Sequence, residues 1–122
     1  MNHLLPLATI CLCHKVFAEP IRLRILNLLS QRESLCVCDL VTVLETTQST
    51  TSRHLAYLKN HGLVTTWREG NWIHYAICAE SECITLLEKT LNHDQEIAEF
   101  HQDLERLLSY ETQPRQCSTN AN

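Results

Sequence analysis

Apolar residues recur at helical spacing through the first half of the chain. The stretch from Leu4 to Ala18 is densely apolar and predicts a first helix that is buried on most sides. A second helix is expected from Pro20 to about Leu29, because proline fits a first helical turn and the apolar residues after it form a core-facing stripe. Further stripes predict a third helix from about Val37 to Glu45 and a fourth from about Gln48 to His61, which Gly62 ends.

The pattern changes from helical spacing to alternation in the middle of the chain. Residues Leu63 to Cys78 are rich in β-branched and aromatic side chains, with Glu69-Gly70-Asn71 between the two halves, and predict a β-hairpin. From Ser81 to Tyr110 the spacing is helical again, and we expect a fifth helix. Residues Glu111 to Asn122 have little to bury and are expected to form a mobile tail. The pattern therefore predicts a mainly α domain over residues 1–110 with one small β-hairpin.

The composition fits one compact, helix-rich domain. Of 122 residues, 44% are apolar and 20% are charged, while glycine and proline supply only 2 and 3 positions. We find no run of about 18 apolar residues and no basic leader with a small-residue cleavage site, so we expect a cytoplasmic protein without a membrane span. The 7 cysteines are odd in number, and a reducing compartment favours thiols used as ligands or switches over a disulfide framework.

Charge is distributed unevenly along the chain. The net charge of −4 argues against a nonspecific polyanion binder. Residues 48–78 are the exception, because they carry Arg53, Lys59 and Arg68 against the single acid Glu69. The part of the chain that follows is rich in acids, which would repel phosphate. If the chain contacts nucleic acid, we expect the central segment to do so.

Two short helices joined by a tight turn and followed by a hairpin describe a winged helix-turn-helix. In this fold the helix of residues 48–61 enters the DNA groove, and its first turns make most of the contacts. An ordinary solvated helix face explains the same short polar side chains, but the adjoining hairpin favours DNA binding. The candidate DNA-binding residues are Gln48, Ser49, Thr50, Ser52, Arg53, His54 and Lys59 in the helix and Arg68 in the hairpin.

Cys36 and Cys38 form a C-x-C pair at the start of the third predicted helix. Two buried structural cysteines are one interpretation, since cysteine is among the residue types most often buried. Metal binding is the other, because thiolates are ligands for soft ions. Residues two apart on a helix point to different sides, so both thiols can hold one ion only where the helix start is distorted. Such binding would strain the helix that packs against the DNA-reading helix.

Several segments carry a shared pattern: residues 18–26, 35–40, 48–55, 62–64 and 68–72, together with Tyr75. In this pattern the chain resembles the ArsR/SmtB family of metal-sensing repressors. The closest similarity is to the arsenical-resistance operon repressors, in which an L-C-V-C-D-L-C segment opens the third helix and its thiolates bind trivalent arsenic or antimony. The resemblance implies a homodimeric repressor that binds palindromic operator sites in double-stranded DNA. It also implies that the operator is released when Cys36 and Cys38 capture As(III) or Sb(III).

This sequence departs from that branch at Val41, where a third cysteine often stands. Cys11 and Cys13 are candidates for the missing ligand, because some family members bring N-terminal cysteines to the third-helix pair. Alternatively, Cys11 and Cys13 are two small core residues of the first helix. Four thiolates would suit cadmium, lead or zinc, whereas a trivalent metalloid needs only two or three. A Cd, Pb or Zn sensor therefore stays open, as does a repressor that responds to thiol oxidation or persulfide.

The remaining candidate ligands fit these schemes less well. Another common site of the family lies on the last helix, and its usual spacing is not matched by His93, Asp94, His101 and Asp103. We interpret Cys78, Cys83 and Cys117 as packing residues or incidental thiols. A thiol enzyme is the alternative from a different class. We expect no enzyme, because no C-x-x-C pair, phosphate loop or paired base accompanies the thiols.

Overall fold

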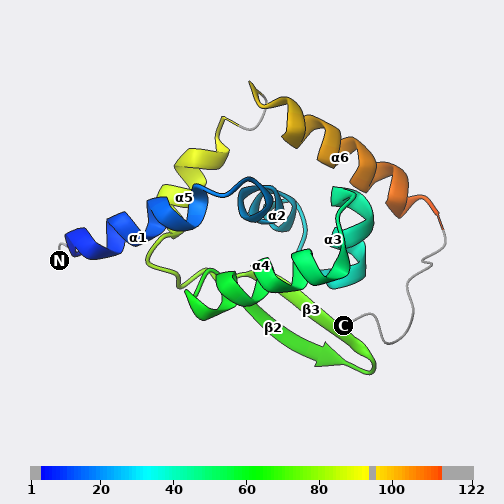
Figure 1. Ribbon diagram of the computed structural model, residues 1–122, viewed down its shortest axis with the longest axis horizontal. Coiled ribbons are helices and arrows are strands. Elements are labelled where there is room, and N and C mark those ends of the chain that lie inside the picture. Colours follow the sequence, from blue (N-terminus) through cyan, green and yellow to red (C-terminus); the bar gives the residue numbers. More distant parts are fainter. Residues whose placement is uncertain (1–3, 94–95, 114–122) are drawn as a thin grey trace.

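The computed structural model describes residues 4–93 and 96–113 (Figure 1). Within these residues the chain forms six helices and three short strands. In chain order they are α1 (Leu7–Phe17), α2 (Pro20–Ser30), β1 (Leu35–Cys36), α3 (Val37–Leu44), α4 (Gln48–Asn60), β2 (Val64–Glu69), β3 (Trp72–Ile77), α5 (Ile84–Leu91) and α6 (Ala98–Glu111).

Local signals fix where the central helices begin and end. At the start of α2 the Glu19 side chain accepts a hydrogen bond from the Arg22 amide at 2.9 Å, and proline occupies the first helical turn. At the start of α4 Thr47 Oγ1 accepts from the Thr50 amide at 3.1 Å. Gly62, after α4, has a φ of 77°, a conformation that a residue with a Cβ atom adopts only at a cost. These starts agree with the predicted ones.

The predicted fifth helix from Ser81 to Tyr110 is wrong as a single element. It is divided into α5 and α6, which run in different directions in Figure 1. The break follows exposed polar residues at the end of α5, and Ile97 before α6 has an extended backbone with φ −111° and ψ 114°. The sequence did not predict the break, because apolar residues keep helical spacing on both sides of it and no glycine or proline stands between them. Of the predicted tail, Glu111 is the last residue of α6, and residues 114–122 lie outside the described part.

A third strand joins the predicted hairpin. β1 pairs antiparallel with β3, with Leu35 opposite Tyr75 and Cys36 opposite His74, so the strand order is β1-β3-β2. The sequence did not predict β1, because a strand of two residues is too short to show alternation. Its consequence is that the segment just before α3 is attached to the hairpin.

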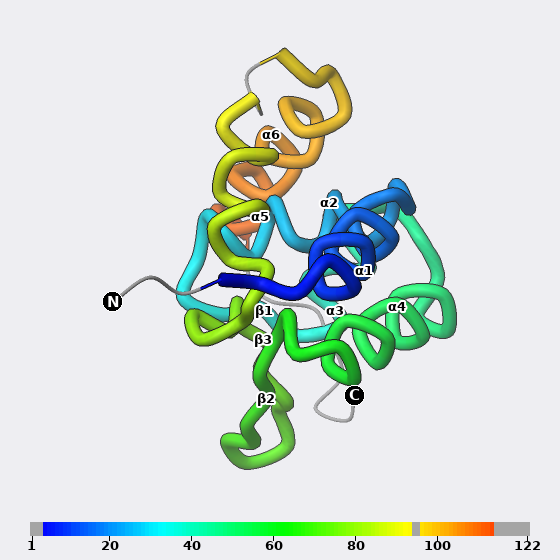
Figure 2. Tube along the Cα trace, turned by 90° about the vertical axis from the view of Figure 1, so that its left-hand side faces the viewer, coloured from blue at the N-terminus to red at the C-terminus, as the bar shows by residue number. Residues whose placement is uncertain are grey.

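One hydrophobic core connects the helices. α2 lies near the middle of the molecule, with α1 and α5 on one side and α3 and α6 on the other (Figure 1), and the hairpin projects from the body (Figure 2). Leucines of five helices are buried in this core: Leu26, Leu28, Leu40, Leu55, Leu58, Leu87 and Leu107. The core holds α3 and α4 in the orientation of a helix-turn-helix.

A buried carboxylate ties α6 to α2 and to the end of α3. The Asp103 side chain has no exposed surface and accepts hydrogen bonds from Arg24 Nε at 2.9 Å and Arg24 Nη2 at 2.7 Å. Arg106 Nη2 donates to the same carboxylate at 2.7 Å. The two guanidinium groups also donate to the carbonyl oxygens of Leu44 and Val43, respectively. The hydrogen bond to Asp103 raises the pKa of Arg24.

A disulfide bond joins α1 to the residue before α5. Cys13 and Cys83 are both buried, and their Cα atoms lie 5.6 Å apart. The expectation of thiols is therefore wrong for this pair. Cys83 does pack in the hydrophobic core, as one of the two interpretations expected, but it is bonded to Cys13. The sequence could not show the pairing, because the two cysteines are 70 residues apart and the spacing of cysteines does not reveal connectivity.

Candidate DNA-binding surface and thiol site

One face of α4 is open to solvent and the other is buried. Thr51, Leu55 and Leu58 point into the core, as predicted. The exposed residues recur at helical spacing and include most of the predicted DNA-binding side chains: Gln48, Ser49, Ser52, Arg53 and Lys59. Thr50 is half-buried. The helix therefore presents short polar side chains around two cations.

His54 lies on the side of α4 that faces α2. Its side chain is only 12% exposed, and its Nε2 is 3.8 Å from Glu19 Oε2. Burial lowers the pKa of His54, and the nearby Glu19 carboxylate opposes that effect. This predicted DNA-binding residue thus contacts the cap of α2, and the exposed face of α4 does not depend on it.

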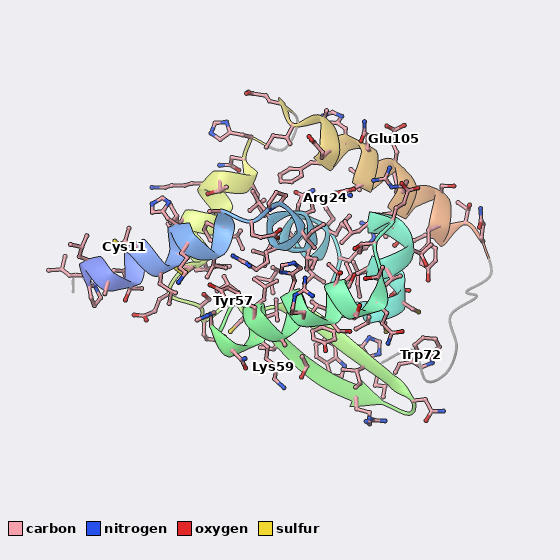
Figure 3. All side chains as sticks on the ribbon, in the orientation of Figure 1. Cys11, Arg24, Tyr57, Lys59, Trp72 and Glu105 are labelled. Atoms are coloured by element: carbon pink, nitrogen blue, oxygen red, sulfur yellow. A yellow bond between two sulfur atoms is a disulfide. The ribbon has the colours of Figure 1, made fainter. Side chains whose placement is uncertain are left out.

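The hairpin continues the basic surface. Arg68 is exposed near the tip, where its Nη1 donates to the Gly70 carbonyl at 3.3 Å, and Gly70 has a φ of 60° that suits the turn. Trp67, beside it, is 41% exposed. Figure 3 shows Lys59 projecting from the side of α4 that faces away from the core. Cations from both elements are thus available on the outside of the helix-turn-helix and wing.

Cys36 occupies the joint between β1 and α3. It ends β1, serves as the N-cap residue of α3 and is completely buried. Its amide donates to Asp39 Oδ2 at 2.8 Å, and Asp39 Oδ1 accepts from the Tyr110 hydroxyl at 2.7 Å. Asp39 is itself buried, and its two hydrogen bonds connect the first turn of α3 to Tyr110 of α6.

His74 is the neighbour of Cys36 that sequence reasoning missed. Its Nδ1 lies 3.9 Å from Cys36 Sγ and 3.2 Å from Ser34 Oγ. On its other side the ring stacks on Trp67 with centroids 5.4 Å apart, and its Nε2 is 3.3 Å from Glu69 Oε1. The contact depends on the pairing of β1 with β3, and β1 had no signal in the sequence.

The other predicted ligands do not gather at Cys36. Cys38 is half-buried and disulfide-bonded. Cys13 is bonded to Cys83, and Cys11 is exposed on α1, on the opposite side of the molecule from α3 (Figure 3). Among residues 4–93 and 96–113, no group of three or more His, Cys, Asp or Glu side chains is arranged to hold a metal ion.

In α6 the carboxylate of Asp103 has a structural role. Asp103 is engaged by two arginines, as described above, while His101 and His93 are exposed. Asp94 lies outside the described residues.

Comparison with known proteins identifies the family. The profile described as "Bacterial regulatory protein, arsR family" matches residues 19–66. The arsenical resistance operon repressor of Escherichia coli strain K12 is 43% identical over 77 residues, which span 63% of this chain and 62% of that protein. A homolog of the cadmium resistance regulator CadC from Staphylococcus aureus is 34% identical over 84 residues, with 69% of each chain covered. This chain belongs to the ArsR family.

Solved structures agree with this assignment to the ArsR family. The AntR antimony-specific transcriptional repressor matches with a TM-score of 0.63 and 30% identity, covering 78% of this chain and 87% of that chain. A homodimeric winged helix-turn-helix domain of a possible ArsR-family regulator from Mycobacterium bovis matches with a TM-score of 0.62 and 28% identity, covering 80% and 94%. The resemblance and the mainly α, winged helix-turn-helix fold are both confirmed.

The chain is accordingly an ArsR-family transcriptional repressor related to arsenical and cadmium resistance regulators, and not an enzyme. In the described part of the chain, none of the helices combines the length and apolar character needed to cross a membrane.

Proposed function

We propose that this repressor binds a palindromic operator in double-stranded DNA as a homodimer and leaves it when Cys36 and Cys38 capture As(III) or Sb(III). The position of Cys36 is the observation that carries the proposal. This residue ends β1 and caps α3, so a ligand on its sulfur acts on the hairpin and on the helix-turn-helix together.

The chemistry of the pair supports a soft inducer. Thiolates bind soft ions and metalloids more strongly than oxygen ligands do. At the start of α3 the backbone changes from extended at Cys36, with ψ 165°, to helical, which is where two residues two apart can approach one ion. Cys38 is disulfide-bonded in this structure, and its sulfur can bind an ion only after reduction to a thiolate. The proposal therefore concerns the reduced protein. Because Asp39 caps the same turn, capture of an ion there competes with the capping contact.

Dimer formation is supported by apolar side chains on the outside of the chain. Leu4 is 85% exposed, Leu7 of α1 is 79% exposed and Leu108 of α6 is 51% exposed. A second copy would cover them, and one of the matching solved structures is homodimeric. In that arrangement the exposed Cys11 stays a candidate ligand for the site of the other subunit.

Other inducers have specific support. The similarity to the cadmium regulator and the nitrogen of His74 beside Cys36 favour Cd, Pb or Zn as alternatives. The Cys13–Cys83 bond favours a response to thiol oxidation or persulfide. Each alternative keeps the fold and the operator and changes only the signal.

One titration separates these signals. Binding of reduced protein to its operator is measured by fluorescence anisotropy in parallel with arsenite, Cd²⁺, Zn²⁺ and peroxide, and the end point gives the number of chains per operator. We expect release by arsenite and two chains per site. Release by peroxide alone, with no effect of arsenite, would replace the metalloid by an oxidant as the inducer.

Arg53→Ala is expected to weaken operator binding at least about fivefold, because the side chain projects from the exposed face of α4 and a base contact is worth about 1 kcal/mol or more. Fold and As(III) uptake should not change. Lys89→Ala, on an exposed position of α5, is the matched control and should bind as the parent does. Operator affinity at two salt concentrations checks both variants. An equal affinity of the Arg53 and Lys89 variants would remove Arg53 from the interface.

A further inference from the structure

Asn27 interrupts a run of buried apolar residues in α2. Its neighbours Ile25, Leu26, Leu28 and Leu29 belong to the core, and Asn27 itself is only 2% exposed. Among the described residues its Oδ1 has no hydrogen-bond partner. A buried amide oxygen without a partner lowers the stability of a fold, whereas leucine offers the same branched shape without that cost. The presence of this amide therefore calls for an explanation other than packing.

Asn27 lines a cavity between α2 and α6, two helices that pack against each other. The cavity has a volume of about 390 Å³, at the lower end of the range for sites that bind small molecules. On the α6 side Phe100, Leu104 and Leu108 follow one another at every fourth position and form an apolar wall. The cavity thus combines apolar side chains with a buried polar group, as binding sites for small organic molecules do.

We propose that this cavity binds a small, uncharged aromatic molecule that carries an N–H or O–H donor. The donor is bound by Asn27 Oδ1, and the ring packs on Phe100 and Leu104. Rotation of the amide about its last side-chain bond exchanges its oxygen and nitrogen, so the oxygen can turn toward the ligand. The exposed carboxylate of Glu105 also lines the cavity and would repel an anion.

This inference goes beyond the proposed function and does not depend on thiol chemistry. None of the described residues that line the cavity is a cysteine. Phe100 and Leu104 lie in the same helix as Asp103, which ties α6 to α2 through Arg24. A bound molecule would therefore act on the packing of α6 and not on Cys36.

The test compares indole, which has an N–H donor, with benzofuran, which has the same shape and no donor. Binding of each probe to the full chain is measured by isothermal titration calorimetry. We expect the parent to bind indole at least about fivefold more tightly, because only indole can donate to Asn27. Asn27→Leu should bind the two probes equally to within about twofold, because it has no acceptor. Asn60→Leu, which changes an exposed asparagine of α4, is the matched control and should keep the preference of the parent.

A measurement on the parent protein guards against misfolding of the variant. Nuclear Overhauser contacts of bound indole should appear to the side chains of Phe100 and Leu104. Equal affinities of the parent for indole and benzofuran, or the absence of these contacts, would overturn the inference. Leu108 is 51% exposed and belongs to the surface that a second copy would cover. Indole binding that weakens as the protein concentration rises would assign the cavity to that second copy and would also overturn the inference.

The stability of the variant without any probe gives a further check. Asn27→Leu removes the unpartnered amide, so its urea midpoint should be at least as high as that of the parent. A lower midpoint would mean that the amide stabilises the fold, and the reason for assigning it to a ligand would be lost.

Discussion

Asp103→Asn is expected to lower the free energy of unfolding by about 3–5 kcal/mol, because it leaves buried positive charge without its counter-charge. The carboxylate is fully buried and receives three hydrogen bonds from Arg24 and Arg106. Asparagine keeps the size but offers one oxygen, and its amide group would point N–H donors at a guanidinium. Since Arg24 and Arg106 are 19% and 31% exposed, water offsets part of the loss, which favours the lower end of the range.

A second ion pair of the same helix provides the control. Arg32 and Glu111 form a two-bonded pair with both distances at 2.7 Å, but their side chains are 29% and 36% exposed. Glu111→Gln should therefore cost about 1 kcal/mol or less. Urea unfolding of the two variants with a shared m value measures the difference. Equal midpoints would mean that the Asp103 network contributes no more than a surface pair.

The Arg32 contact also has a pH dependence of known sign. The hydrogen bond from Arg32 lowers the pKa of Glu111, so this pair stabilises the folded chain above the pKa of the unfolded state. That contribution is lost as the pH falls through the lowered pKa in the folded state.

Features with local causes were predictable from the sequence. Pro20 after a capping acid, the hydroxyl of Thr47 and the glycine at position 70 each fix a backbone conformation within a few residues. The starts of α2 and α4 and the hairpin tip were therefore correct. The exposed face of α4 also followed from spacing alone, because burying Thr51, Leu55 and Leu58 leaves only one side for Arg53.

Features that depend on distant pairing were not predictable. The neighbourhood of Cys36 is set by the register of β1 on β3, which brings His74 next to a residue 38 positions away. The Cys13–Cys83 bond likewise depends on how α1 packs beside α5. Spacing rules describe one element at a time, so they gave the C-x-C pair but not its third neighbour.

Cys36→Ser and Cys38→Ser are each expected to keep operator binding and to lose release by arsenite. Serine is close to cysteine in size, so the first turn of α3 and its Asp39 cap should persist. Its hydroxyl is hard and poorly ionised and cannot replace a thiolate for a soft metalloid. If the coupling between inducer and operator is about 1–3 kcal/mol, arsenite should weaken the parent complex about 5- to 150-fold and each variant less than about twofold.

Two further cysteines make this prediction specific. Cys78→Ser changes a half-buried thiol just after β3 and should be released by arsenite as the parent is. Cys11→Ser changes the exposed thiol of α1: a weakened response would assign it as a ligand from the other subunit, and an unchanged response would leave Cys36 and Cys38 as the thiol ligands. Operator anisotropy against arsenite concentration measures all four variants under reducing conditions. If Cys36→Ser still leaves the operator at the arsenite concentration that releases the parent, the inducer must act away from the joint between β1 and α3, and the capping contact between Cys36 and Asp39 has no part in the response.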